Sequence, residues 1–217
     1  ATYEDIHKAD IILVLGFDIK EINPVAALMV KEASEKGAEL LLAFEGTSRL
    51  DRFASEKFGV HENDVKVIAE KLVNAKNPLI ITIGNLDKKL AEAIIKPEAK
   101  ILLMQPKSNT QGILDMGIKC ADSQAEYNVI FGEDPMGSDD EKAKKLIANS
   151  KFTIVCDVLM TETAKVADVV LPFVSFAETS GTYTNSEGRV QKLNKAMTSK
   201  TGKENHQVIA EMLEIVE

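Results

Sequence analysis

The sequence is poor in the residues that build disulfide-rich and metal-binding proteins. Its 217 residues include 2 cysteines, 3 histidines and no tryptophan. Cys120 and Cys156 form no Cys-x-x-Cys pair and have no histidine at ligand spacing, so this stretch alone supplies neither a disulfide framework nor an iron–sulfur cluster. His7, His61 and His206 are scattered. No two of them share an i, i+4 face that would bind zinc, so each is interpreted as a surface or capping imidazole and no metal ligand is predicted.

The chain also lacks an excess of positive charge and long apolar runs. With 26 Lys and Arg against 34 Asp and Glu the formal net charge is −8, which disfavours nucleic acid and anionic lipid surfaces as partners. The longest apolar run, 11–17, is too short to span a bilayer, and the charged first residues predict no targeting peptide. A composition of 45% hydrophobic and 28% charged residues indicates a globular protein.

Short aliphatic runs alternate with stretches of helical period, which predicts an α/β protein with βαβ units and parallel sheets buried on both faces. The predicted strands are 10–16, 38–44, 78–84, 100–105, 127–132, 152–157 and 168–171. The predicted helices are 25–36, 65–75, 86–96, 142–148 and 205–216. Pro24 and Gly37 are predicted to begin and end the helix 25–36. Asn63 and Asp64 are predicted to cap the helix 65–75, and Asn85 the helix 86–96. Ser138 and Glu141 have the spacing of a capping box ahead of the helix 142–148.

Two stretches rich in Gly, Ser, Thr and Asn, 106–120 and 172–191, interrupt this alternation and are predicted to be long loops. Long ordered loops in α/β proteins are more often functional than idle. The first loop separates two similar halves, so a boundary near Lys107 is expected, with one α/β lobe at 1–107 and another at 108–217. Open α/β sheets bind ligands beyond the carboxyl ends of their strands, and candidate site residues are sought there.

Gly16 and Asp18 follow the first predicted strand, and Gly132 and Asp134 follow the fifth. A glycine at such a place lets the backbone approach a ligand, and a helix N-terminus favours phosphate, although a lone glycine is more often a turn residue. Neither string is a Gly-x-Gly-x-x-Gly fingerprint, and no Gly-x-x-x-x-Gly-Lys-Ser/Thr loop occurs. Ordinary NAD binding and P-loop chemistry are therefore disfavoured.

Asp157 closes one aliphatic strand and Asp168 opens the next. A carboxylate there either accepts two N–H bonds from the edge of a guanine or caps the turn at 161–164. Thr161 and Thr163 leave a similar choice between helix capping and contact with a phosphate or ribose. No nucleophile elbow, Cys/His pair or acid/base carboxylate pair is present. No catalytic residue is predicted.

Several of these segments together resemble the signature of molybdopterin oxidoreductase large subunits. The strings are Ala-Asp-Val-Val-Leu-Pro at 167–172, Gly-Thr-Tyr-Thr-Asn-Ser-Glu-Gly-Arg-Val-Gln at 181–191, and Asn-Thr-Gln-Gly-Ile-Leu-Asp-Met-Gly at 109–117. The resemblance covers nearly the whole chain and is weak around 45–100. Within the family it is greatest to the formate dehydrogenase alpha subunit and to the large iron–sulfur subunit of NADH-quinone oxidoreductase.

Formate dehydrogenases of this type bind two molybdopterin guanine dinucleotides between two Rossmann-like domains. The resemblance therefore implies that both lobes are Rossmann-like, with the signature loops in the second. It implies that Gly16 and Asp18 face one guanosine. The residues that it places against the other guanosine are Gly132, Asp134, Asp157, Thr161, Thr163 and Asp168.

The chain departs from the family pattern at several cofactor contacts. Ala-Phe-Glu-Gly at 43–46 replaces an Asp-Pro-Arg-like end, Lys107 stands near the position of an arginine, and Asn-Pro at 23–24 replaces His-Pro. Phe44 offers a ribose no hydrogen bond, and Lys107 has no planar guanidinium. These losses indicate a cofactor site that has decayed. The family's cluster cysteines, metal ligand and C-terminal barrel-like domain are also missing from this sequence, which is therefore interpreted as a fragment.

The leading hypothesis is a structural, inter-subunit role in the large iron–sulfur subunit of an NADH-quinone oxidoreductase. Its partners are then other subunits of the complex, its location is cytoplasmic and peripheral to a membrane complex, and the iron–sulfur clusters lie outside this chain. The alternative is a fragment of a functional formate dehydrogenase that holds the guanine dinucleotide. A stand-alone α/β module for another nucleotide conflicts with the specific strings at 109–117 and 181–191.

Overall fold

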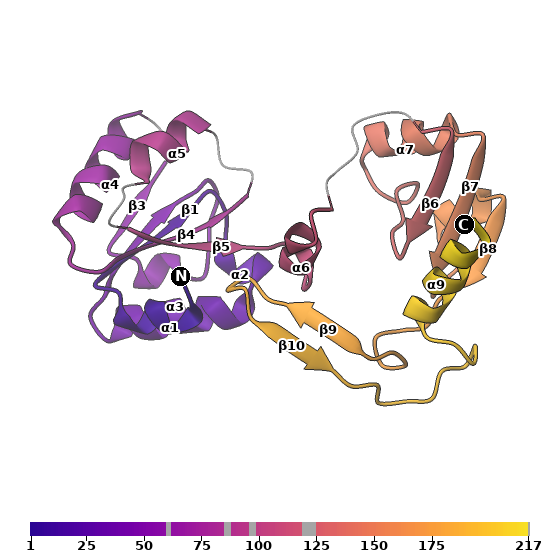
Figure 1. Ribbon diagram of the computed structural model, residues 1–217. Coiled ribbons are helices and arrows are strands. Elements are labelled where there is room, and N and C mark those ends of the chain that lie inside the picture. The colour runs from indigo at the N-terminus through magenta and orange to yellow at the C-terminus, as the bar shows by residue number, and fades with distance from the viewer. Residues whose placement is uncertain (60–61, 85–87, 96–98, 119–124, 217) are drawn as a thin grey trace. The chain divides into compact units, whose positions relative to one another are not determined.

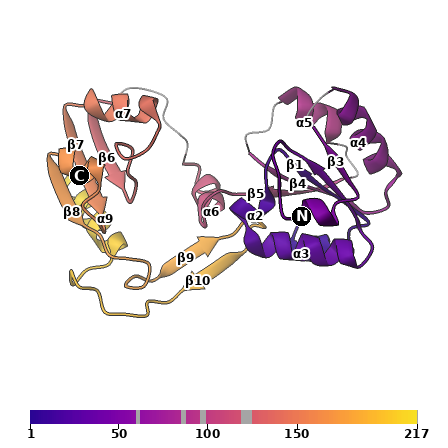
Figure 2. The same ribbon diagram turned by 180° about the vertical axis from the view of Figure 1, so that it is seen from behind.

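The computed structural model describes residues 1–59, 62–84, 88–95, 99–118 and 125–216, and the chain divides into two compact units (Figures 1 and 2). Unit 1 consists of residues 1–118 and 183–191, and unit 2 consists of residues 119–182 and 192–217. The predicted boundary near Lys107 lies inside unit 1. Contacts formed by helix α6 (Thr110–Asp115) and by 183–191 keep these segments with the first sheet. The division into two lobes at 107 stays a prediction.

Unit 1 contains a five-stranded parallel sheet in the order β3-β2-β1-β4-β5. Its strands are β1 (Ile11–Leu15), β2 (Glu39–Ala43), β3 (Glu56–Phe58), β4 (Pro78–Ile83) and β5 (Lys100–Met104). Four of them are the predicted aliphatic runs, because a parallel sheet covered on both faces needs apolar side chains at nearly every position. The edge strand β3 has no counterpart among the predicted strands, since three residues of sequence Glu-Lys-Phe carry no aliphatic run.

Helices cover both faces of this sheet (Figure 1). The helices of unit 1 besides α6 are α1 (Tyr3–Lys8), α2 (Ile19–Ile22), α3 (Pro24–Glu35), α4 (Glu62–Asn74), α5 (Lys88–Ile94) and the short 3-10 helix η1 (Asp51–Phe53). Pro24 begins α3, and Gly37, at φ +107°, follows its end as predicted. Helix α4 begins at Glu62, so the predicted caps Asn63 and Asp64 are wrong. The predicted cap Asn85 lies outside the described residues.

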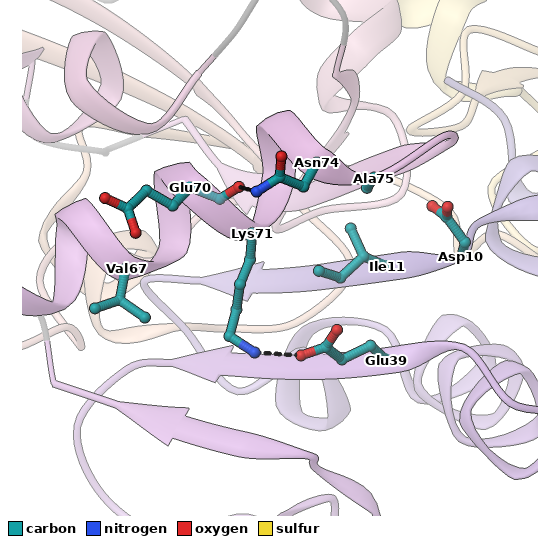
Figure 3. A pocket seen from close by; sticks show the side chains of 8 residues that line it. All are labelled: Asp10, Ile11, Glu39, Val67, Glu70, Lys71, Asn74 and Ala75. Carbon is teal, nitrogen blue, oxygen red and sulfur yellow. Dashed lines mark hydrogen bonds and ion pairs between the residues drawn. The ribbon is translucent and has the colours of Figure 1, made fainter.

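The face under α4 and α5 carries an ion-pair cluster at the amino ends of the strands. Lys71 of α4 places its Nζ 2.5 Å from Glu39 Oε1 (Figure 3), and the same Nζ lies 2.7 Å from Glu56 Oε1. Hydrogen bonds to these carboxylates raise the pKa of Lys71. A pocket lies beside this cluster, but α/β sheets bind ligands at the opposite, carboxyl end. The cluster therefore fastens α4 to two strand starts.

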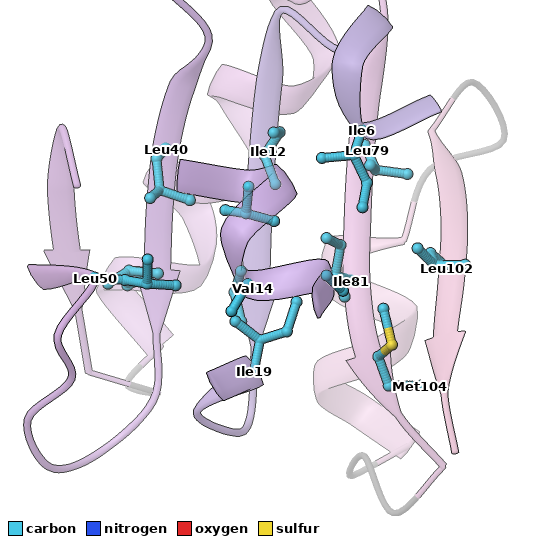
Figure 4. Close-up of a cluster of buried hydrophobic side chains, with 14 of the residues drawn as sticks. Ile6, Ile12, Val14, Ile19, Leu40, Leu50, Leu79, Ile81, Leu102 and Met104 are labelled. Atoms are coloured by element: carbon cyan, nitrogen blue, oxygen red, sulfur yellow. The ribbon is translucent and has the colours of Figure 1, made fainter. Parts of the chain in front are cut away.

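The opposite face packs against α1 and α3 through an aliphatic core (Figure 4). Ile6 of α1 and Val30 of α3 are fully buried there against Ile12, Leu40 and Ile81. The aromatic content of the chain is 5%, and this core is correspondingly built mainly from Ile, Leu, Val and Ala, with Phe17, Phe44 and Met104 as the exceptions. Both large clusters of buried apolar side chains in the described residues belong to unit 1.

Unit 2 contains a three-stranded parallel sheet in the order β6-β7-β8. Its strands are β6 (Tyr127–Phe131), β7 (Phe152–Asp157) and β8 (Val169–Pro172), and its helices are α7 (Glu141–Ala148), α8 (Glu162–Val166) and α9 (Asn205–Val216). The predicted capping box at Ser138 is wrong, because Asp140 caps α7 by accepting the Lys142 and Ala143 N–H groups while the Ser138 hydroxyl donates to the Pro135 carbonyl. Together the two units confirm the predicted α/β class with parallel sheets and flanking helices.

Both predicted loops contain regular structure. Helix α6 lies within 106–120, and β9 (Gly181–Thr184) and β10 (Val190–Leu193) form a hairpin that begins within 172–191. The stretches 106–120 and 172–191 are rich in Gly, Ser, Thr and Asn, so their composition indicates loops although tertiary contacts order these short elements. None of the helices in the described ranges is long and apolar enough to cross a membrane.

Candidate functional site

Gly16 and Asp18 lie directly after the carboxyl end of β1, as predicted. Gly16 adopts a φ of +85°, and its N–H donates to the Ala43 carbonyl at 2.8 Å. Asp18 caps α2: its Oδ1 accepts the Lys20 N–H at 3.1 Å and the Ser48 hydroxyl at 3.0 Å. Because Ser48 belongs to the loop after β2, the Asp18 carboxylate ties together the loops that follow two neighbouring strands. Sequence reasoning missed Ser48, which stands in no recognisable motif.

The loop after β2 is held by Phe44 and Lys57. Phe44 is 6% exposed and belongs to the core, and Lys57 Nζ lies 5.0 Å from the centre of its ring. Lys57 also donates to the Gly46 carbonyl and pairs with Asp51 at 2.8 Å. This pairing lowers the pKa of Asp51. The side chain that replaces the family's Asp at this strand end is therefore packed into the protein.

In unit 2, Asp134 and Thr163 are bonded to each other. Asp134 Oδ1 accepts the Thr163 N–H at 2.8 Å and the Thr163 hydroxyl at 2.7 Å, and it also accepts the Gly137 N–H at 3.2 Å. These hydrogen bonds lower the pKa of Asp134. Thr163 is fully buried, and its Oγ1 accepts the Met136 N–H at 2.9 Å. The pair thus fastens the loop after β6, which carries the exposed Gly132, to the start of α8.

Asp157 and Thr161 lie after the carboxyl end of β7. Asp157 Oδ1 accepts the N–H groups of Val158 and Leu159 at 2.6 and 3.1 Å. Thr161 caps α8 by accepting the Ala164 N–H at 3.2 Å. The sequence left a choice between capping of the 161–164 turn and contact with a nucleotide. The capping is present, but Thr161 provides it rather than Asp157.

Asp168 lies at the other end of the unit 2 sheet. It precedes β8, and its Oδ2 accepts the Thr153 N–H at 2.8 Å at the amino end of β7. Its own N–H donates to the Thr153 carbonyl. Candidate residues were sought at the carboxyl ends of the strands, but Asp168 does not lie there, because the starts of parallel strands lie together at the opposite end of the sheet.

The hydrogen bonds that the aspartate oxygens already accept within the chain decide whether these residues could also bind a guanine dinucleotide. Asp18, Asp134 and Asp157 each use Oδ1 for two or more hydrogen bonds within the chain. An oxygen with two accepted bonds has its lone pairs occupied, which leaves Oδ2 for a ligand. A two-bond contact with a guanine edge requires both oxygens. The arrangement therefore does not fit that contact, and the cofactor-facing role of the predicted residues stays a prediction.

Two of the resemblance strings hydrogen-bond to each other within unit 1. Asn109 Oδ1 accepts the Thr184 N–H at 2.8 Å. The Ser186 hydroxyl accepts the Gln105 N–H at 3.1 Å, and Glu187 Oε2 accepts the Tyr3 N–H at 2.9 Å. The turn between β9 and β10 is therefore docked on α6, on the end of β5 and on the first residues of the chain. These contacts give both strings a structural function.

Replacing Gly112 with alanine is expected to loosen this docking by about 1–3 kcal/mol, the usual cost of overpacking. A Cβ atom on the buried Gly112 would clash with Asn109 Oδ1, the acceptor of the Thr184 N–H. Amide hydrogen exchange at Thr184 measures the effect. The matched control is Gly84→Ala, because a Cβ atom there meets nothing within 4 Å. Equal exchange at Thr184 in both variants would contradict the prediction.

Glu204 binds the two residues that flank the β9–β10 hairpin, Ser180 before β9 and Lys195 after β10. Its carboxylate accepts the Ser180 N–H and hydroxyl, both at 2.8 Å, and pairs with Lys195 at 2.9 Å. These bonds lower the pKa of Glu204 from 4.5 to about 2. Glu178 similarly accepts the Ser175 N–H and hydroxyl, which lower its pKa.

The Ser180 amide resonance is expected to titrate with a midpoint near pH 2. Because the folded pKa of Glu204 lies below its ordinary value, its stabilising contribution is present above pH 4.5 and is lost as the pH falls toward about 2. NMR titration of wild type and of Glu204→Gln makes the comparison. A wild-type midpoint near 4.5, or the same titration in the variant, would show that these bonds do not control the carboxyl.

A basic pocket on unit 1 was not expected from the sequence. It is lined by Lys20, Lys31, Arg49 and Arg52 around Phe53. The Arg52 guanidinium lies 4.7 Å and Lys31 Nζ 5.2 Å from the centre of the Phe53 ring. These cations come from three separate segments of a chain whose net charge is −8, so no local run of charge marks them.

Metal-ligating groups do not gather in the part of the chain that the structure describes: no cluster of three or more His, Cys, Asp or Glu could hold an ion there. Cys156 is buried in β7, and burial raises the pKa of its thiol. His7 and His206 are exposed, as interpreted from the sequence. Cys120 and His61 lie outside the described residues.

Comparisons with known proteins identify the family. The sequence matches the family model for molybdopterin oxidoreductase over residues 1–215. The F420-dependent formate dehydrogenase 2 subunit alpha of Methanococcus maripaludis is 47% identical over 79 residues, which are 36% of this chain and 12% of that relative. A G-type subunit of the NADH-quinone oxidoreductase of Rhizobium meliloti is 36% identical over 93 residues, 42% of this chain and 11% of the relative.

A longer alignment joins the chain to the G-type subunit of the NADH-quinone oxidoreductase of Pseudomonas fluorescens. The two are 33% identical over 144 residues, which are 58% of this chain and 16% of the relative. The matched regions thus make up between 11% and 16% of these relatives. Since the family model covers nearly all of the sequence, and since both units have the parallel sheets that the resemblance implies, this chain belongs to the molybdopterin oxidoreductase family.

Proposed function

We propose that this chain is a structural part of the large iron–sulfur subunit of an NADH-quinone oxidoreductase, a complex of respiratory electron transport. In this proposal it binds no guanine dinucleotide, holds neighbouring subunits in place, and lies on the cytoplasmic side of a membrane complex. The iron–sulfur clusters are carried by other parts of the subunit. Quinone and NADH are handled elsewhere in the complex.

The hydrogen bonding of the strand-end aspartates carries this proposal. Oδ1 of Asp18, Asp134 and Asp157 is occupied within the chain, and Phe44 is packed into the core where a ribose contact is expected. These side chains stabilise the fold without a cofactor, so they would be retained in a subunit whose cofactor has been lost. Two NADH-quinone oxidoreductase G subunits are among the relatives of this chain, at 36% and 33% identity.

The alternative is a formate dehydrogenase alpha subunit that binds molybdopterin guanine dinucleotide. Its specific support is the 47% identity with the Methanococcus maripaludis alpha subunit. Gly132 also leaves room for a ligand, since a Cβ atom there meets nothing within 4 Å. In this case Gly16 and Gly132 admit the nucleotides, and Asp157 offers one oxygen.

The test is the metal and nucleotide content of the full-length subunit purified from its source. Molybdenum is measured by mass spectrometry, and acid-released guanine nucleotide by chromatography, with the Methanococcus maripaludis formate dehydrogenase as a positive control. We expect neither molybdenum nor guanine nucleotide above background. Stoichiometric amounts of both would overturn the structural role and establish the alternative.

If nucleotide is present, two variants locate it. Asp157→Ala is then expected to weaken retention by about 1–3 kcal/mol through loss of a charged hydrogen bond. Asp168→Ala, at the amino end of the sheet, serves as the matched control and leaves retention unchanged. Equal losses in the two variants would mean that the nucleotide does not bind at the carboxyl ends.

A further inference from the structure

The basic pocket of unit 1 combines cations with apolar side chains and is lined by no acid. Its volume is about 310 Å³, and nine residues line it. Four of the nine are Lys or Arg, and the other five are apolar: Pro24, Ala27, Leu28, Leu50 and Phe53. Like charges that lie close together repel one another, so an anionic partner would stabilise this arrangement.

The two arginines of the pocket lack an acceptor. The sequence contains three arginines, Arg49, Arg52 and Arg189, and the first two line the pocket. Both are exposed, and within the described residues neither guanidinium donates a hydrogen bond or forms an ion pair. Asp51, which stands between them in the sequence, is paired with Lys57 instead. Two guanidinium groups, whose geometry matches a carboxylate or a phosphate, are therefore available to an external acceptor.

The two lysines of the pocket are held only by neighbours on their own helices. Lys20 Nζ lies 3.2 Å from Glu21 Oε1, and Lys31 Nζ lies 3.5 Å from Glu35 Oε1. Ion pairs of this kind lie at the surface, where water screens them and their contribution to stability is small. Both ammonium groups can therefore exchange these partners for another carboxylate.

Apolar side chains of α3 are exposed next to the cations. Val25 and Leu28 are 60% and 66% exposed, and Leu28 lines the pocket. Residues three apart lie on the same side of a helix, so Val25, Leu28 and Lys31 form one row along α3. An inorganic anion would pair with the cations and leave the apolar part of this row in water. A polypeptide segment with acidic and apolar side chains covers both.

The backbone beside the pocket is not arranged for phosphate. Phosphate sites in α/β proteins use free N–H groups at the starts of helices. Here the Lys20 N–H at the start of α2 donates to Asp18, and the Ala26 N–H at the start of α3 donates to Asn23. These amides are already satisfied within the chain. The carboxylates of a polypeptide therefore fit this pocket better than a phosphate.

We propose that the basic pocket and the neighbouring Val25 dock an acidic amphipathic segment of an adjacent subunit. Carboxylates of the segment pair with Arg49 and Arg52, and its apolar side chains cover Val25 and Leu28. Arginine and aromatic residues are the types that interfaces enrich, and this surface carries both. The inference rests on the proposed function, in which the chain holds neighbouring subunits in place, and it adds the surface that does so and the charge of the partner.

Modification of arginine by phenylglyoxal, followed by mass spectrometry, tests the proposal in the full-length subunit alone and in the assembled complex. We expect Arg49 and Arg52 to react more slowly in the complex by on the order of tenfold, because a docked segment excludes water and reagent. Equal rates would overturn the proposal. Protection already present in the subunit alone would also overturn it, by assigning the pocket to another part of the same subunit.

Pyrophosphate is the probe for a small anion. Added to the subunit alone, it is expected to leave the rates at Arg49 and Arg52 at the values found with sodium chloride of the same ionic strength. Protection by pyrophosphate as strong as that caused by assembly would assign the pocket to a small phosphate ligand and overturn the proposal.

A charge reversal tests whether the pocket's cations hold the segment. In the assembled complex, Arg49→Glu is expected to return Arg52 to the reactivity that it has in the subunit alone, since a like charge repels the carboxylates of the segment. The matched control is Lys66→Glu, because Lys66 is exposed in α4 on the other face of the sheet. It is expected to leave Arg52 protected. The same reactivity of Arg52 in both variants would contradict the proposal.

A zero-length cross-link identifies the occupant. Arg49→Lys keeps the positive charge and supplies an amine, which a water-soluble carbodiimide joins to a carboxylate in contact with it. We expect the new amine to be linked to Asp or Glu of a different polypeptide. A link to the same subunit or to a second copy, or no link at all, would overturn the proposal. None of these readouts depends on molybdenum or nucleotide content, so a failure here is distinguishable from a failure of the proposed function.

Discussion

Replacing Ile80 with alanine is expected to lower the free energy of unfolding of unit 1 by about 2–5 kcal/mol, the range for large-to-small changes in a core. Ile80 lies in β4, the strand next to β1, and is fully buried. Its side chain packs with Leu13 of β1 and with Ile68 and Leu72 of α4. Alanine loses the transfer free energy of three carbon atoms and leaves a cavity between the sheet and α4 that close packing cannot fill.

Urea unfolding of wild type and variant measures this loss, with a probe in unit 1 because two compact units need not unfold together. The matched control is Val73→Ala in α4, whose side chain is 61% exposed. It is expected to change stability by no more than about 0.5 kcal/mol. A loss of that small size for Ile80→Ala would mean that the α4 face is not packed as described.

The sheets could be predicted from the sequence because parallel strands buried on both faces carry a strong local signal. Runs such as 11–15 and 78–83 are aliphatic at almost every position. The signal is absent from β3, β9 and β10, which are three or four residues long and polar. These segments are strands because they pair with a neighbouring strand, and the local sequence pattern does not show which segment will lie beside them.

The positions of most candidate residues at strand and helix ends could be predicted from the sequence, Asp168 excepted, but the hydrogen bonds between them could not. Asp134 and Thr163 each stand at a strand or helix end, yet their contact joins positions 29 residues apart. Capping preferences describe a residue and its near neighbours, so they place Thr161 correctly and cannot assign Thr163 to Asp134.

Replacing Thr163 with valine is expected to destabilise unit 2 by about 2–3 kcal/mol, the cost of leaving a buried group unpaired. Thr163 is fully buried, and its hydroxyl accepts the Met136 N–H at 2.9 Å while it donates to Asp134 at 2.7 Å. Valine keeps the shape and removes both bonds. Thr161→Val, two residues earlier, removes an ordinary helix cap and is expected to cost about 1 kcal/mol. Urea unfolding followed in unit 2 ranks the two variants, and an equal cost would contradict the buried bridge.

The stability lost in Thr163→Val is also expected to depend on pH, and this dependence separates the bridge from simple packing. The Thr163 hydroxyl is the foremost cause that lowers the pKa of Asp134 below 3.8. A carboxyl with a depressed folded pKa stabilises the fold above its unfolded pKa, and this contribution disappears as the pH falls through the folded value. The difference between wild type and variant should therefore be full at neutral pH and shrink below pH 3.8. If the hydroxyl served packing alone, the difference would be the same at both pH values, because no proton would be linked to it.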